Sequence, residues 1–245
     1  MRTKSCLAFG ASIFALCLSA RTADYSGNGK SGFGGAIGQG SLTLTDDGTT
    51  VSGTVTKGAA GSFDNALVLY IDSVSGGFAD TSGFADSGDG LRRAISGING
   101  SGNTSRLTMP SVFLADYAIA LGPDSSENYG GLWQLLNGGS FVFLSSVNLN
   151  PTGNASSSTY TFSFDVSQIG LSPNSGQSFR LLGTYISNSG FRSDEALAGD
   201  VSGVQGWNPF TGTADAPYAI VPEPSTALLF GLAALAAVCC RRRRN

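Results

Sequence analysis

The sequence contains no histidine, and its central part contains no cysteine. All four cysteines lie near the two ends of the chain, at Cys6, Cys17, Cys239 and Cys240. Without histidine there can be no Ser-His-Asp triad, no histidine general base and none of the usual zinc sites. Without cysteine, the segment between the ends, residues 24–221, forms no disulfide and offers no thiolate nucleophile or metal ligand.

Basic residues are also scarce in residues 24–221. This segment has seven lysines and arginines against sixteen aspartates and glutamates, so its net charge is −9, whereas that of the whole chain is −3. A surface this acidic repels phosphate backbones, so nucleic acid is not expected as a partner. The same charge keeps the segment soluble outside a cell and attracts divalent cations.

Glutamate is nearly absent from residues 24–221, where only Glu127 and Glu195 occur. A pair of aspartates could still hydrolyse a glycoside, which makes a weak aspartate-based hydrolase one hypothesis. The aspartates stand in turn sequences, however, and none lies in an apolar pattern that would raise its pKa. We therefore expect no enzymatic activity.

The N-terminal residues have the pattern of a secretory signal peptide. A basic start at Arg2 and Lys4 precedes an apolar stretch from Cys6 to Leu18, and small residues follow. This pattern predicts export by the Sec machinery and removal of residues 1–23, with cleavage after Ala20 or Ala23.

The C-terminal residues combine a stiff spacer, an apolar stretch and a basic end. The spacer consists of Val221, Pro222, Glu223, Pro224 and Ser225. Its two prolines keep it extended, and the apolar stretch after it predicts a transmembrane helix over residues 226–240. That helix reaches only ~21–24 Å, short of a ~30 Å hydrocarbon core, which suits a temporary anchor. The terminal segment 241–245 begins with Arg241, Arg242, Arg243 and Arg244, which hold it in the cytoplasm and place the rest of the chain outside.

Two other interpretations of this end are a permanent tail anchor and a buried core helix. A permanent anchor is usually longer, about 20 apolar residues, and a core helix would not end in four arginines. The order and terminal position of the three parts resemble the PEP-CTERM sorting signal of bacteria that make exopolysaccharide or biofilm matrix. The resemblance implies that an exosortase-type membrane protease cleaves near the motif in 222–225. The precursor would then sit in the inner membrane, and the mature protein at the cell surface or in the extracellular matrix.

The patterns in residues 24–221 predict one all-β domain, an antiparallel and jelly-roll-like β-sandwich of about ten strands. Alternating apolar residues predict strands such as 41–45, 51–56 and 159–166, and the continuous apolar run 65–72 predicts a strand buried on both faces. A disordered matrix filler is the alternative, but aromatic and branched residues recur too often for it. Residues 24–40 are expected to form a loose glycine-rich arm, and residues 91–95 one helical turn.

Residues 73–104 form the longest predicted loop and contain Asp80, Asp86 and Asp89. Carboxylate oxygens suit Ca²⁺, although their spacing does not fit the helix-loop-helix calcium motif. Asp and Gly are also what tight turns require, and this structural interpretation is the preferred one.

Two strand sequences, 67–72 and 115–121, are similar to those of surface-layer and carbohydrate-binding sandwiches of the DOMON and glucodextranase C-terminal type. That resemblance would place Asp72, Asp116 and Tyr117 near a ligand or ion site. Trp207 lies in a loop bounded by Gly and Pro and is the best candidate for an exposed ring that stacks on sugars. Our first hypothesis is thus a non-catalytic surface or matrix protein that binds extracellular polysaccharide, and the second a purely structural surface protein.

Overall fold

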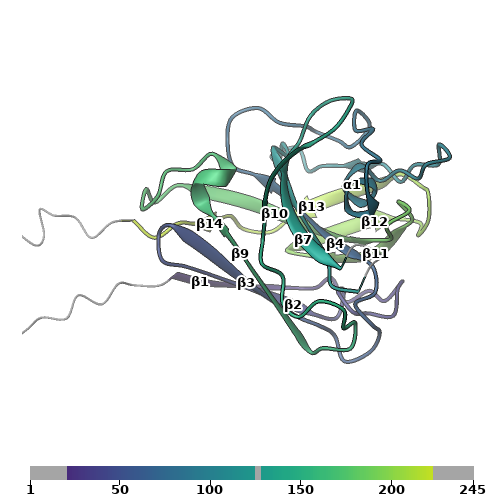
Figure 1. Cartoon of the computed structure of the whole chain (residues 1–245), viewed down its shortest axis with the longest axis horizontal. Coiled ribbons are helices and arrows are strands. Elements are labelled where there is room, and N and C mark those ends of the chain that lie inside the picture. The colour runs from purple at the N-terminus through teal and green to yellow at the C-terminus, as the bar shows by residue number, and fades with distance from the viewer. Residues whose placement is uncertain (1–20, 125–127, 223–245) are drawn as a thin grey trace, which may run out of the picture.

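The computed structural model describes residues 21–124 and 128–222 (Figure 1). This part of the chain is an all-β fold with one short α-helix and one 3₁₀ helix. The strands are β1 (Arg21–Ser26), β2 (Ser41–Asp46), β3 (Thr50–Thr56), β4 (Ala66–Asp72), β5 (Leu107–Thr108), β6 (Tyr117–Gly122), β7 (Tyr129–Gln134), β8 (Val142–Ser146), β9 (Thr159–Asp165), β10 (Ser178–Ile186), β11 (Arg192–Leu197), β12 (Gly199–Gly203), β13 (Phe210–Ala214) and β14 (Tyr218–Ala219). The helices are α1 (Gly90–Ser96) and η1 (Val166–Ile169).

Two sheets form the sandwich. One has the strand order β1-β2-β3-β9, and the other has the order β11-β10-β4-β6-β7-β8, with β14 added beside β10. All pairs in these two sheets are antiparallel, which confirms the prediction of an all-β, antiparallel fold. Consecutive strands pair within β1-β2-β3, β6-β7-β8 and β10-β11, whereas β9 and β10 return after long connections to lie beside β3 and β4. The jelly-roll likeness stays a prediction.

The two sheets are also joined at both edges. At one edge the chain after β1 pairs with β11, since the Asn28 N–H donates to the Ala196 carbonyl at 3.1 Å. At the other edge the chain after β8 pairs with β9, since Asn150 and Thr161 exchange backbone hydrogen bonds of 2.9 and 2.7 Å. The sandwich is therefore closed by backbone hydrogen bonds without any disulfide.

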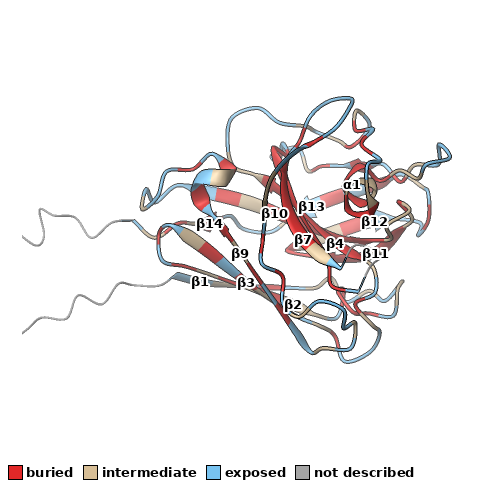
Figure 2. Cartoon of the chain, viewed as in Figure 1, coloured by how far each residue is buried: buried red, intermediate tan, exposed pale blue. Residues whose placement is uncertain are grey.

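The central strand β4 explains why there are two cores. Its alternate residues Leu67, Leu69 and Ile71 pack between the two sheets, whereas Val68 and Tyr70 face the opposite side. Successive side chains of a strand point to opposite faces, so a strand apolar at every position needs cover on both. The prediction that this strand is buried on both faces is confirmed, and Figure 2 shows buried residues concentrated in the strands.

A third layer covers the outer face of the larger sheet. It consists of α1 and of a small sheet with the order β12-β13-β5, in which β5 runs parallel to β13. Leu91 and Ile95 of α1, Leu107 of β5 and Phe210 of β13 belong to the second core. The helical turn expected at 91–95 is confirmed, and the predicted long loop 73–104 contains this helix and contributes to the third layer.

The expectation of a loose arm over residues 24–40 is wrong. Residues 21–26 form β1, and the glycine-rich segment 31–40 is wrapped around the side chain of Glu195. The Glu195 carboxylate is fully buried and accepts hydrogen bonds from the N–H groups of Phe33, Gly35, Ile37 and Gly38 at 2.6–3.1 Å. Gly34 and Gly35, with φ of 97° and 86°, give the segment the left-handed turn that aims these N–H groups inward.

The first and last described strands lie at the same end of the molecule (Figure 1). The hydroxyl of Tyr218 in β14 lies 3.1 Å from the carbonyl oxygen of Arg21, the first residue of β1. Residues 21–23, which the sequence interpretation assigned to the signal peptide, pair with residues 44–46 of β2. Residues 1–20 lie outside the described part of the chain.

Candidate functional site

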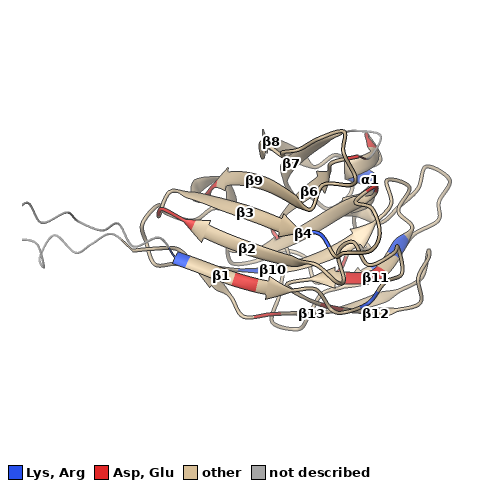
Figure 3. Cartoon of the chain, turned by 90° about the horizontal axis from the view of Figure 1, so that it is seen from below, with Lys and Arg blue, Asp and Glu red and all other residues tan. Residues whose placement is uncertain are grey.

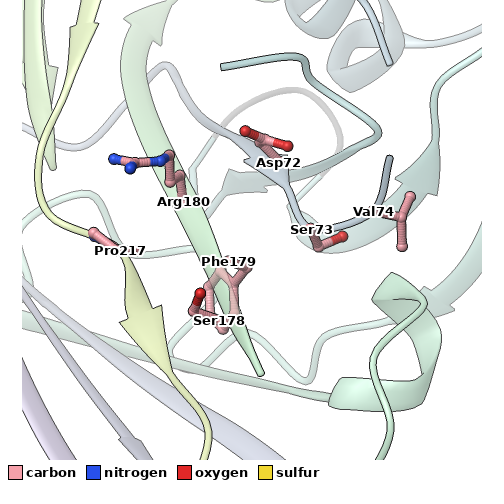
Figure 4. A pocket seen from close by; sticks show the side chains of 7 residues that line it. All are labelled: Asp72, Ser73, Val74, Ser178, Phe179, Arg180 and Pro217. Atoms are coloured by element: carbon pink, nitrogen blue, oxygen red, sulfur yellow. The ribbon is translucent and has the colours of Figure 1, made fainter. Parts of the chain in front are cut away.

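A polar pocket of about 170 Å³ opens where β4 ends and β10 begins (Figure 4). Its lining consists of Asp72, Ser73, Val74, Ser178, Phe179, Arg180 and Pro217. Asp72 lies directly opposite Arg180 in the β4–β10 register. None of the ion pairs found in the described residues joins the two, and Figure 4 shows their charged groups pointing in different directions.

Asp116 lies beside this pocket, but its carboxylate is used by the backbone. One of its oxygens accepts hydrogen bonds from the N–H groups of Ser73 and Val74, both at 3.0 Å. It therefore holds the turn that follows β4. Tyr117 is buried in the inner core, and burial raises the pKa of its hydroxyl, as does the neighbouring Asp116 charge. The structure thus brings Asp72 and Asp116 together, whereas Tyr117 does not line the pocket.

The pKa of Asp72 is raised above its ordinary value, chiefly because the carboxyl is partly buried. The Asp116 charge raises it further, and a hydrogen bond from Leu114 and the Arg180 charge oppose the shift. A carboxyl with a raised pKa binds its proton more tightly in the folded state than in the unfolded state. Its stabilising contribution is therefore complete below the unfolded pKa and is lost as the pH rises through the folded pKa.

We expect Asp72→Asn to raise the thermal midpoint at pH 7 and to leave it unchanged near pH 3, where wild-type Asp72 is itself protonated. Asp80→Asn is a matched control of opposite sign, because hydrogen bonds from Ser82 lower the pKa of Asp80. That variant should lower the midpoint at pH 7. Thermal unfolding at both pH values measures the differences, and a lower midpoint for Asp72→Asn at pH 7 would contradict this account.

The three aspartates considered for calcium bind backbone N–H groups, and Asp86 and Asp89 also form ion pairs with Arg92, at 3.6 and 3.0 Å. Asp80 accepts the Ser82 N–H at 2.6 Å, and Asp89 caps α1 by accepting the Arg92 N–H at 2.8 Å. Asp86 is buried and accepts the N–H of Phe141 at 2.6 Å, so it ties the loop to the strand region before β8. Among residues 21–124 and 128–222 there is no group of three or more carboxylate, cysteine or histidine side chains that could hold a metal ion. The calcium hypothesis thus gains no ligand cluster there.

Trp207 is an exposed aromatic residue held in a fixed position. It lies between β12 and β13, and 42% of its surface is exposed. Its Nε1 donates to the Ser189 carbonyl at 3.4 Å, and its ring meets Phe191 edge to face, with centroids 5.1 Å apart. Phe191 in turn stacks on Phe33, which packs against the inner core. A row of rings therefore leads from the core to the surface and supports an indole that faces solvent.

The outer face of the four-stranded sheet carries a regular array of hydroxyl groups that the sequence interpretation did not recognise as a surface. The register places Thr43, Thr54 and Thr161 in one row across the strands. Thr45, Ser52 and Ser163 form the next row. A groove of about 310 Å³ follows these rows, lined by Ser52, Gly53, Thr54, Asn148, Thr161, Phe162 and Ser163.

One charged side chain lies in these two rows: Asp24 of β1 is opposite Thr43 and accepts a hydrogen bond from its hydroxyl at 2.6 Å. Asp, Glu, Lys and Arg are all absent from residues 128–164, which include β7, β8 and nearly all of β9. Figure 3 shows β2, β3 and β9 side by side with little charge along their length. The signal that could have found the face is the polar half of the alternation in residues 41–45, 50–56 and 159–163.

The last described residues are fixed by Asp46. Its carboxylate is buried and accepts hydrogen bonds from the Tyr218 hydroxyl at 2.5 Å and from the Val221 N–H at 3.0 Å. Burial, together with the bond and charge of Asp46, raises the pKa of Tyr218. The Ile220 N–H donates to the Gln177 carbonyl at 2.8 Å. We call the contacts of Asp46 with Tyr218 and Val221 the C-terminal clamp.

Of the predicted sorting motif, Val221 and Pro222 belong to the described residues. Glu223, Pro224, Ser225, the predicted transmembrane helix 226–240 and Arg241–Arg244 lie outside them. No helix within residues 21–124 and 128–222 has the length and apolar character to cross a membrane.

Comparison with known families identifies a PEP-CTERM protein-sorting motif over residues 221–244. The prediction of this sorting signal is confirmed. No curated protein and no solved structure matches the chain. The resemblance of the body to DOMON and glucodextranase C-terminal sandwiches stays a prediction.

Proposed function

We propose that this PEP-CTERM protein is a non-catalytic protein of the cell surface or extracellular matrix that binds polysaccharide. The motif implies export and processing by an exosortase, a membrane protease, after transient anchoring in the membrane. In our proposal the Sec machinery exports the chain, the precursor stays in the inner membrane with its body outside the cytoplasm, and cleavage releases the body.

The observation that carries the binding role is the exposed, supported indole of Trp207. A flat ring held by Phe191 and by a hydrogen bond to the backbone loses little freedom when it stacks on a sugar ring. The hydroxyl groups on the outer face of β2, β3 and β9 offer further donors and acceptors for a polysaccharide.

Trp207 lies far from the C-terminal segment by which the precursor would be attached to the membrane. Strand β10 starts at Ser178, beside β14 and the C-terminal clamp, and runs for nine residues to Ile186. Trp207 contacts Ser189 and Phe191, which follow that strand. At about 3.3 Å per residue, roughly 30 Å separates the indole from the clamp. Before release the ring would thus point away from the membrane.

The hydrolase hypothesis is less well supported. Asp72 lines the pocket between β4 and β10, and the Asp116 carboxylate lies next to it. One carboxylate oxygen of Asp116 already accepts hydrogen bonds from the N–H groups of Ser73 and Val74. A pair of aspartates with one member committed to the backbone is a poor acid–base pair.

The test is co-sedimentation of the full-length protein, in detergent, with extracellular polysaccharide from an exosortase-containing bacterium. We expect Trp207→Ala to weaken the affinity at least about fivefold, because stacking of one nucleic-acid base on an aromatic side chain contributes ~1–3 kcal/mol and a sugar ring offers a contact of similar size. Val204→Ala is the control, since Val204 is exposed in the same loop. Binding that persists in Trp207→Ala would place the site elsewhere, and no binding by any form would favour the purely structural hypothesis.

A further inference from the structure

The folded body continues without a linker into the sorting motif. Strand β14 pairs with the start of β10, and Ile220 and Val221 are bonded to Gln177 and Asp46. Tyr218 and Ile220 are both buried in the inner core. The matched motif begins at Val221, so the last residue held by the body is the first residue of the motif.

A protease that cuts near the motif needs an extended stretch of chain on either side of the bond. Enzymes that bind extended peptides pair with their backbone N–H and C=O groups. Residues 218–219 already pair with β10, and the N–H groups of Ile220 and Val221 donate to Gln177 and Asp46. The chain from Val221 to Pro224 can span at most about 11 Å. The folded body would therefore hinder the approach of the enzyme sterically.

The start of β1 also contacts the segment that leads to the motif. The Tyr218 hydroxyl that donates to Asp46 also lies 3.1 Å from the carbonyl oxygen of Arg21. The segment leading to the motif is therefore held against the paired ends of β1 and β2, where Arg21 lies opposite Asp46. Release of residues 218–221 requires the loss of all these contacts together.

We propose that the C-terminal clamp controls access of the exosortase to the motif, so that the folded body is processed only when residues 218–221 detach from Asp46 and β10. This inference rests on the proposed sorting by that protease. It makes local opening of the clamp the step that limits release, and it links processing to the folding state of the body.

The experiment follows conversion of the full-length precursor by pulse-chase in a cell that contains the exosortase. One variant receives a flexible spacer of about nine residues, about 30 Å when extended, between Val221 and Pro222. Two others weaken the clamp: Tyr218→Phe removes only the hydroxyl, and Asp46→Ala removes the acceptor. Asp47→Ala is the control, because the Asp47 carboxylate caps the same turn at Thr49 and Thr50 without touching the C-terminal segment.

We expect the spacer variant to be processed at least about fivefold faster than wild type, and Tyr218→Phe and Asp46→Ala to be faster by a similar factor. Asp47→Ala should convert at the wild-type rate. The spacer leaves the body unchanged, so it remains informative if Asp46→Ala misfolds. Conversion of the spacer variant and Tyr218→Phe at the wild-type rate would overturn the inference. If the wild-type precursor is not converted, or Glu223→Ala does not slow it, the sorting function itself is overturned.

Discussion

Glu195→Ala is expected to lower the free energy of unfolding by about 4 kcal/mol, which corresponds to a fall of roughly 10 °C in the thermal midpoint. The wild-type carboxylate is fully buried and accepts four backbone hydrogen bonds from residues 33–38. Alanine would leave four N–H groups without an acceptor, and each unsatisfied buried donor costs at least ~1 kcal/mol. The segment 31–40 should therefore open, which amide hydrogen exchange at these residues would show directly.

The matched control is Asp194→Ala, on the same strand and next to the same segment. Asp194 accepts one N–H of that segment, from Gly32 at 3.0 Å, so its loss should cost about 1 kcal/mol. Glu195→Gln keeps a carbonyl acceptor but adds N–H donors that face the wrong way, and it should fall between the two. Equal unfolding midpoints for Glu195→Ala and Asp194→Ala in urea would show that the buried carboxylate does not organise the segment.

Arg192→Met is expected to raise the free energy of unfolding by about 1–3 kcal/mol. Arg192 is fully buried, and none of the ion pairs found in the described residues includes it. Its guanidinium donates to the Thr184 hydroxyl and, at 3.4 Å, to the Ser105 carbonyl, while its Nε lacks a partner. Its Cζ lies 6.0 Å from the centre of the Phe210 ring. A buried charge without a counter-charge is costly, and an apolar side chain of similar volume avoids that cost.

Arg192→Lys should have the opposite effect and destabilise the fold. It keeps a positive charge in the second core but cannot donate to Thr184 and Ser105 together, because an ammonium lacks the planar fork of a guanidinium. Denaturant unfolding of the two variants at pH 7 gives the comparison. If Arg192→Met is the less stable of the two, then the hydrogen bonds and the contact with Phe210 outweigh the cost of burial.

The parts of the fold that sequence predicted are those in which apolar residues recur with a simple period. The run 65–72 is apolar at nearly every position, and β4 is indeed buried on both faces. The alternation in residues 159–165 likewise matches β9, whose burial alternates residue by residue. In both cases the burial of side chains alone determines the pattern, so the pattern can be recognised without knowing the partner strands.

The parts that sequence could not predict depend on partners far along the chain. Strand β11 contains Arg192 and Glu195, which resemble surface residues until the segment 31–40 and the third layer cover them. The glycine-rich segment itself has no apolar period, and its order comes from a carboxylate about 160 positions away. Propensity and periodicity are local quantities, and these contacts are not local.

For the candidate sites the same division holds. The exposure of Trp207 was predicted because its loop lies between a glycine and a proline. Asp80, Asp86 and Asp89 were preferred as turn residues, and each of them accepts a hydrogen bond from a nearby backbone N–H group. The role of Asp46 was not predicted, because Asp-Asp-Gly is an ordinary turn sequence. Asp46 also binds the C-terminal segment because Tyr218 and Val221, which are distant in sequence, lie next to it in the fold.

The meeting of the two ends at Arg21 and Tyr218 makes the body a module with a single point of attachment. A domain of this kind can be inserted into a loop of another exported protein, because host residues on either side need not be moved apart to accommodate it. It can also be circularly permuted, with a short bridge joining the old ends and new ones opened in a distant exposed loop. Gene fusion could thus redistribute this fold among surface proteins without changes to its core.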